Sequence, residues 1–112
     1  MIESIIIAYL NNVLDVPAFA EVPKDAPKAF VVVEKTGGGE SGHIAHPTII
    51  VQSYEESLYK AALLNKRVKM AMLAAITLPE ISSVELNASY NYTFEKQYRY
   101  QAVYDITYYE ED

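Results

Sequence analysis

The chain begins with apolar residues spaced three or four positions apart, the pattern of one helix face. These residues are Ile2, Ile5, Ile6, Tyr9, Leu10 and Val13. Pro17 prevents the helix from continuing. We therefore predict an N-terminal helix that ends before residue 17, although the three successive isoleucines would also suit a strand.

Strand-like runs follow. Phe19–Val22 predicts a short strand, and Phe30–Thr36 and Thr48–Ser53 predict two longer antiparallel strands. Between the longer strands, all four glycines of the chain fall within Gly37–Gly42. Glycine adopts positive φ without steric cost, but ordering it costs much backbone entropy. We expect a long loop over 37–46. It is either an ordinary hairpin connection or a mobile segment that becomes ordered against a partner.

The second predicted helix has the clearest pattern. Ser53, with Glu56 three residues later, matches a capping box at its start, and Pro79 ends it. Its expected apolar stripe consists of Leu58, Ala61, Ala62, Val68, Ala71, Met72 and Ala75. Basic residues populate the other face: Lys60, Lys66, Arg67 and Lys69. The small alanines would let this helix pack closely on a sheet.

Two alternating runs complete the chain and predict a hairpin with one buried face. The first has apolar positions at Val84, Leu86, Ala88, Tyr90, Tyr92 and Phe94, and the second at Tyr98, Tyr100, Ala102, Tyr104, Ile106 and Tyr108. Glu95–Gln97 forms the turn between them. The order α-β-β-β-α-β-β predicts one α+β domain over residues 1–112. We expect a mostly antiparallel sheet of four to five strands with two helices packed on one face.

Composition excludes several classes of function. The absence of cysteine excludes disulfides, thiolate metal sites and cysteine nucleophiles. Fifteen acidic and nine basic residues give a net charge of −6, which argues against binding nucleic-acid phosphates. Since no apolar run approaches the ~20 residues of a membrane span and no basic signal-peptide start is present, we expect a soluble cytoplasmic protein. Seven of the ten tyrosines follow residue 89, which fits strands and protein interfaces equally well.

No residue pattern specifies an enzyme. His43 and His46 offer two ligands where zinc needs three or four. The glycine run lacks the Gly-Lys-Ser/Thr ending of a phosphate loop, and Ser41 lacks a nucleophile motif around it. The carboxylates of the predicted strands fall mostly at solvent-facing positions: Glu34, Glu85 and Asp105. We therefore expect no catalytic, cofactor-binding or metal-binding residues.

The order of elements and three short motifs together resemble a known family. The motifs are a strand ending in Thr-Gly-Gly at Thr36–Gly38, the run Pro47–Tyr54 leading into an Ala-rich helix, and Tyr98–Ala102 in the last strand. In this order, and over nearly the whole chain, they are similar to the small tail-terminator (tail-completion, neck) proteins of long-tailed bacteriophages and prophages.

The resemblance implies a structural virion protein with neither catalysis nor cofactor. Members of that family form a ring, usually hexameric, that caps the tail tube, ends its polymerisation and joins the tail to the head connector. The implied partners are copies of the same chain, the tail-tube protein and the head-connector (neck) protein, with assembly in the host cytoplasm.

We expect the glycine segment to contact a neighbouring subunit or the tail tube. The residues are Thr36, Gly37, Gly38, Gly39, Glu40, Ser41, Gly42 and His43. This long loop departs from the family pattern. The alternative interpretation of the chain is a small cytoplasmic ligand-binding or regulatory α+β domain.

Overall fold

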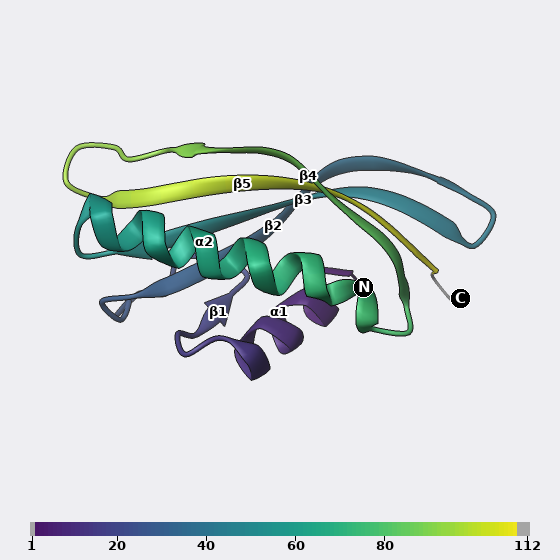
Figure 1. Cartoon of the computed structure of the whole chain (residues 1–112), viewed down its shortest axis with the longest axis horizontal. Helices are drawn as coiled ribbons and strands as arrows, with labels where there is room; N and C mark the ends of the chain where they lie inside the picture. Colours follow the sequence, from purple (N-terminus) through teal and green to yellow (C-terminus); the bar gives the residue numbers. More distant parts are fainter. Residues whose placement is uncertain (1, 110–112) are drawn as a thin grey trace.

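A computed structural model describes residues 2–109, except for the side chains of Glu40 and Ser41. Its helices are α1 (Ile2–Val13) and α2 (Leu58–Ala74), the latter followed by a 3-10 turn, η1 (Ala75–Thr77). The strands are β1 (Ala18–Phe19), β2 (Phe30–Ser41), β3 (Ile44–Glu55), β4 (Ile81–Asn91) and β5 (Tyr98–Tyr109). The predicted order is confirmed (Figure 1). The acidic end at residues 110–112 lies outside the described residues.

The strands form one five-stranded sheet in the order β1-β2-β3-β5-β4. The short β1 pairs with β2 in parallel, and every other pair is antiparallel. β5 therefore lies between β3 and β4, and it joins the two long hairpins into a single sheet. The sheet is mixed, as in many α+β folds.

The larger of two hydrophobic clusters joins both helices to one face of the sheet, and the smaller one comprises Phe30, Val32 and Tyr54. The larger cluster includes Ile6 and Leu10 from α1, Val68 from α2, and Val51 and Tyr104 from the central strands. In β3 and β5, alternate residues enter this core because successive strand side chains point to opposite faces. The predicted face of α1 is largely confirmed, since Ile2, Ile6 and Leu10 are buried. Val13, at its last turn, is 48% exposed.

The glycine segment is mostly strand, so the prediction of a long loop over 37–46 is wrong. β2 continues to Ser41, β3 begins at Ile44, and these two residues pair across a turn formed by Gly42 and His43. The interpretation as a hairpin connection is correct. Gly42 has a φ of +63° at the first turn position, where a type II′ turn favours glycine.

Gly38 allows the backbones of β2 and β3 to approach each other closely. Its φ is +119°, and a Cβ at this position would clash with the backbone carbonyl of His46 on the paired strand. A register shift between Lys35 and Gly37 precedes it. Residue 38 therefore has to be glycine because of its place in a paired strand. The sequence had instead suggested that this glycine belongs to a flexible loop.

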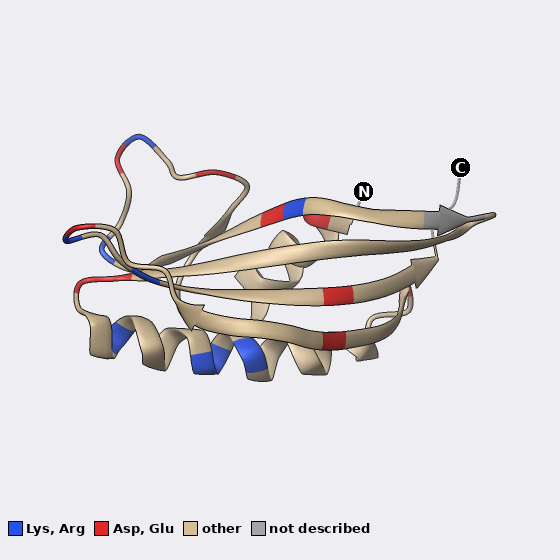
Figure 2. Cartoon of the chain, turned by 90° about the horizontal axis from the view of Figure 1, so that it is seen from above, with Lys and Arg blue, Asp and Glu red and all other residues tan. Residues whose placement is uncertain are grey.

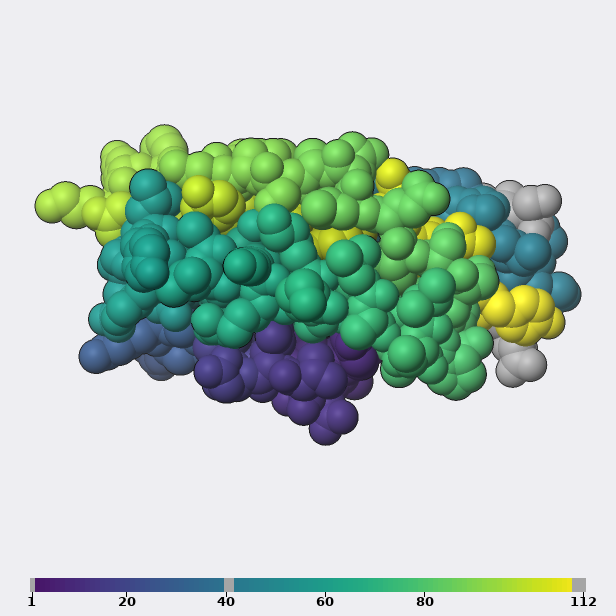
Figure 3. Space-filling model, in the orientation of Figure 1, coloured from purple at the N-terminus to yellow at the C-terminus, as the bar shows by residue number. Residues whose placement is uncertain are grey.

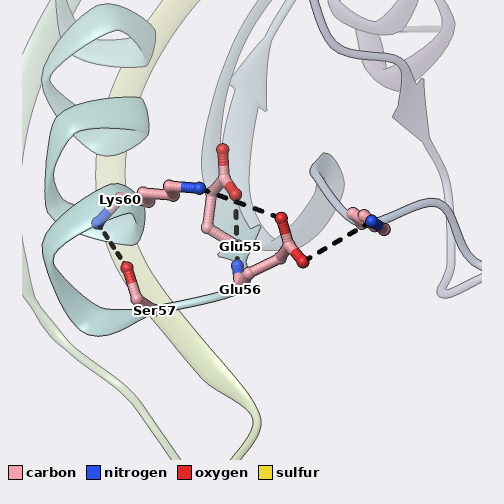
Figure 4. Close-up of polar contacts among 5 residues, drawn as sticks. Glu55, Glu56, Ser57 and Lys60 are labelled. Atoms are coloured by element: carbon pink, nitrogen blue, oxygen red, sulfur yellow. Dashed lines mark hydrogen bonds and ion pairs between the residues drawn. The ribbon is translucent and has the colours of Figure 1, made fainter.

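The start of α2 also differs from the prediction. Ser57 is the N-cap, and its Oγ accepts a hydrogen bond from the backbone N–H of Lys60 at 3.2 Å (Figure 4). Ser53, the predicted cap, is fully buried in β3 opposite Tyr100. β3 continues to pair with β5 as far as Glu55, so Ser53 stays in the strand. The helix therefore begins four residues later than the capping-box pattern at Ser53 predicts.

The predicted continuous buried face over residues 84–94 is also wrong. The register of β4 against β5 shifts between Leu86 and Ala88. An extra residue in one strand reverses the faces of all residues beyond it. Val84 therefore packs against the helical core, whereas Tyr90 pairs with Gln101 on the opposite face. β4 ends at Asn91, and the predicted turn begins with Glu95 at a positive φ of 56°.

Candidate functional site

The predicted contact segment lies at the end of the β2–β3 hairpin, which extends past the helices (Figure 1). Thr36 and His43 are exposed there, as are the four glycines. The ring of His43 lies 5.9 Å from that of Tyr109. His46 is tied to β5, because its Nδ1 lies 3.2 Å from Thr107 Oγ1 in a hydrogen bond. The segment is thus an exposed end of the sheet.

The described residues contain no cluster of metal-binding side chains. Among residues 2–109, no group of three or more His, Cys, Asp or Glu side chains is placed to hold a metal ion. The strand carboxylates are exposed, as predicted: Glu34, Glu85 and Asp105. No helix in the described part of the chain is long and apolar enough to cross a membrane.

Three buried polar atoms have no hydrogen-bond partner within the described structure: Ser53 Oγ, Asn65 Oδ1 and Tyr104 Oη. Tyr104 is fully buried, and burial raises the pKa of its phenol well above the ordinary value. Its hydroxyl is therefore neutral at physiological pH and enclosed by the core. This hydroxyl is therefore not accessible at the protein surface.

Helix α2 has a second apolar face, opposite the buried one. Five residues of its outer surface follow one another at helical spacings of three or four positions, and we call them the α2 stripe: Tyr59, Leu63, Lys66, Met70 and Leu73. Tyr59 is 74% exposed and Met70 is 68% exposed. Figure 3 shows α2 across one face of the molecule, beside α1. A surface helix normally has a polar outer face, so this exposed apolar stripe is unusual for a helix that faces solvent.

The charge on α2 has one sign. The helix contains Lys60, Lys66, Arg67 and Lys69 and no acidic residue. Since α2 contributes +4 to a chain of net charge −6, the remainder has a net charge of −10. Lys60 pairs with Glu56 and Arg67 with Asp15, whereas Lys66 and Lys69 have no ion pair within the described residues. Basic residues gather along α2 in Figure 2.

The sheet face opposite the helices, called here the outer sheet face, is acidic. Glu85 and Asp105 lie directly opposite each other on β4 and β5. Asp105 accepts hydrogen bonds from Asn87 Nδ2 at 2.9 Å and Thr48 Oγ1 at 3.4 Å, and no cation among the described residues pairs with it. Two like charges facing each other across strands are unfavourable, so a cation from outside would be attracted here.

An apolar row lies beside these carboxylates on the outer sheet face. Ile50 of β3, Val103 of β5 and Ala88 of β4 are paired in register and only partly covered. Glu34 pairs with Ile50 at the β2 end of the row. The row has no helix over it, because both helices pack on the opposite face of the sheet.

Arg99 is the basic residue at one end of the outer sheet face, and it is engaged locally. Its guanidinium lies over the rings of Tyr92 at 4.7 Å and Tyr54 at 5.5 Å. Its Nη1 donates a hydrogen bond to Tyr54 Oη at 2.7 Å. These contacts hold the Arg99 side chain at the β4–β5 hairpin end, and no ion pair joins it to Glu34, Glu85 or Asp105 among the described residues.

A groove of about 550 Å³ runs between the two helices. Its lining residues are Tyr9, Val13, Leu14, Asp15, Arg67, Met70, Ala71 and Ala74. Tyr9 Oη donates to the backbone carbonyl of Ala71 at 2.7 Å, and Arg67 lies 3.7 Å from Asp15. Met70 belongs to both the groove and the α2 stripe, so the two surfaces are continuous.

The chain matches no protein-family model, and no curated protein matches its sequence.

The sequence interpretation missed the α2 stripe. It also missed that Glu34, Glu85 and Asp105 lie on the same face of the sheet. The signal for the stripe was present, because Tyr59, Leu63, Met70 and Leu73 repeat at helical spacing. The outer sheet face could be assembled only once the strand order placed Glu85 beside Asp105.

Proposed function

We propose that the protein is a tail terminator of a long-tailed bacteriophage or prophage. In this role several copies form a closed ring on the end of the tail tube. The ring stops addition of further tube subunits and presents a surface to the head connector. Its partners are other copies of this chain, the tail-tube protein and the neck protein, and it needs no cofactor.

The observation that carries the proposal is the element order α-β-β-β-α-β-β around a mostly antiparallel sheet. It fits the expectation drawn from the resemblance over nearly the whole chain. A second support is that exposed large apolar side chains are most numerous on α2 and on the β4–β5 hairpin. Exposed apolar surface of this kind favours an assembly role over a solitary domain.

The β2–β3 hairpin end supplies one contact in this proposal. Its residues from Thr36 to His43 belong to a paired ribbon that extends past the helices. An ordered ribbon loses less entropy on binding than a mobile loop would, which favours its use as a contact surface. Ile44, next to the turn, is apolar and 46% exposed.

The groove between α1 and α2 favours the alternative, a small ligand-binding or regulatory domain. Its size of about 550 Å³ falls in the range of small-molecule sites. Its walls include the exposed Val13 and Met70, so a bound molecule would remain open to solvent on that side.

Deletion of the coding region from the phage or prophage tests the proposal. We expect tails of uncontrolled length, or tails that fail to join heads, in electron micrographs of lysates. Reintroducing the intact chain should restore normal particles. Tails of normal length, joined normally to heads without the protein, would contradict the terminator function and leave the ligand-binding alternative.

A second experiment locates the contribution of the hairpin. Ile44→Asp places a charge on the exposed ribbon, and Ile76→Asp, on the 52% exposed Ile76 of η1, is its matched control. If the hairpin makes the contact, Ile44→Asp should fail to complement the deletion while Ile76→Asp succeeds. Both variants should keep the wild-type circular dichroism spectrum. Full complementation by Ile44→Asp would remove the hairpin from the interface.

A further inference from the structure

We propose that the α2 stripe of one copy packs on the outer sheet face of the next copy. The inference rests on the proposed ring and specifies how its subunits meet. The occupant of each surface is therefore a second copy of this chain, turned so that the helical side of one meets the open sheet side of the other.

Charge complementarity selects this arrangement. Lys66 lies within the α2 stripe and Lys69 beside it, and neither has an ion pair among the described residues. The outer sheet face offers Glu34, Glu85 and Asp105, which also have no cationic partner there. Joining the two surfaces gives both sets of charges a partner and relieves the repulsion between the paired Glu85 and Asp105.

Both surfaces also carry apolar side chains that could pack against each other. Leu63, Met70 and Leu73 of the stripe would lie against the apolar row Ile50, Val103 and Ala88. A 17-residue helix is about 25 Å long. Four strands at a spacing of ~4.8 Å, together with the side chains at the sheet edges, have a similar width, so the helix could lie across them. This contact covers only part of the ~800 Å² per partner of a standard interface. The hairpin contact would therefore add to it.

The geometry makes the contact head-to-tail. The α2 stripe and the outer sheet face lie on opposite sides of the molecule, since the helices cover one face of the sheet. Each copy therefore uses one surface for the copy before it and the other for the copy after it. Such heterologous contacts generate a ring when the rotation closes. A two-fold contact of α2 with α2 would instead bring eight basic residues together without an acid in either helix.

Paired charge reversals test this arrangement. Variant A is Lys66→Glu/Lys69→Glu, and variant B is Glu34→Lys/Glu85→Lys. Glu34, Lys66 and Glu85 are exposed and Lys69 is partly exposed. None of the four has an ion pair among the described residues, whereas Asp105 is hydrogen-bonded to Asn87 and Thr48. Self-association of wild type, A, B and an equimolar mixture of A and B is measured by sedimentation and mass photometry.

We expect A and B each to raise the apparent Kd for self-association by at least about tenfold, because each opposes like charges across the contact. The mixture should recover association close to that of wild type. In an alternating ring, the acidic helix of A meets the basic sheet of B, and the basic helix of B meets the acidic sheet of A.

Matched controls carry the same change in net charge at exposed positions outside α2 and outside the strands of the sheet. They are Lys24→Glu/Lys96→Glu for variant A and Glu21→Lys/Glu80→Lys for variant B. Both controls should associate as wild type does. Circular dichroism and urea unfolding of every variant verify the fold.

The outcomes separate this inference from the proposed function. If wild type forms rings and variant B also forms them, the outer sheet face is not the partner and the inference is wrong. If A and B fail separately and the mixture also fails, the two surfaces do not meet. A wild-type chain that remains monomeric at all concentrations, with and without tails, would overturn the ring itself.

Discussion

Met72→Ala should destabilise the protein far more than Met70→Ala, although the two methionines are only two positions apart in α2. Met72 is 0% exposed and belongs to the core with Val68 and Tyr104, whereas Met70 is 68% exposed on the α2 stripe. Truncating a fully buried methionine costs about 2–5 kcal/mol, because transfer free energy is lost and a cavity remains. Truncating an exposed one changes stability by roughly 0.5 kcal/mol or less.

The comparison isolates burial, because both substitutions gain the same small increment of helix propensity. Urea unfolding is monitored by circular dichroism at low protein concentration, where self-association does not contribute. With an m-value of about 2 kcal/mol/M, the midpoint of Met72→Ala should fall by roughly 1–2.5 M. The midpoint of Met70→Ala should fall by less than about 0.3 M. Equal midpoints for the two variants would show that the buried and exposed faces of α2 have been assigned wrongly.

Three further predictions test particular contacts. Gly38→Ala should lower stability by about 1–3 kcal/mol, because of the positive φ and the clash with His46, whereas Gly39→Ala, which faces open space, should not; equal urea midpoints would refute the backbone argument. Ser57→Ala should cost about 1 kcal/mol as the loss of an N-cap, while Ser53→Ala, whose Oγ has no hydrogen-bond partner among the described residues, should cost less; the reverse order in thermal melts would contradict the assignment of Ser57 as a stabilising N-cap. Burial raises the pKa of Tyr104, so the neutral phenol favours the folded state, and stability should fall as the pH rises above about 10, where the unfolded tyrosine ionises. Tyr104→Phe should reduce this alkaline loss of stability and be neutral or stabilising at pH 7; an unchanged pH profile would contradict the assignment.

The periodic elements of the fold could be predicted because their patterns depend on local geometry. The faces of α1, the alternation in β5 and the α+β order all follow from spacing in the sequence. The errors arose where tertiary pairing changed a local preference. Ser53 matched a capping box but lies in β3, because the strand gains hydrogen bonds to β5 as far as Glu55.

The remaining errors have similar causes. The bulge between Leu86 and Ala88 reverses the face of Tyr90, and no residue type in this run signals a bulge from sequence. The glycines of 37–42 suggested a mobile loop, yet Gly38 is required by the close approach of two paired strands. Of the candidate site, the exposed positions of Glu34, Glu85 and Asp105 were predictable. Their placement on one face needed the strand order.

The central claim is that the protein caps the end of a tail tube. Purified, gold-labelled protein is added to tails produced without it, and the labels are located by electron microscopy. The account predicts label at one end of each tube, the end that joins the head, and a block to further addition of tube protein. Label along the length of the tubes, or tubes that continue to grow with the protein bound, would contradict it.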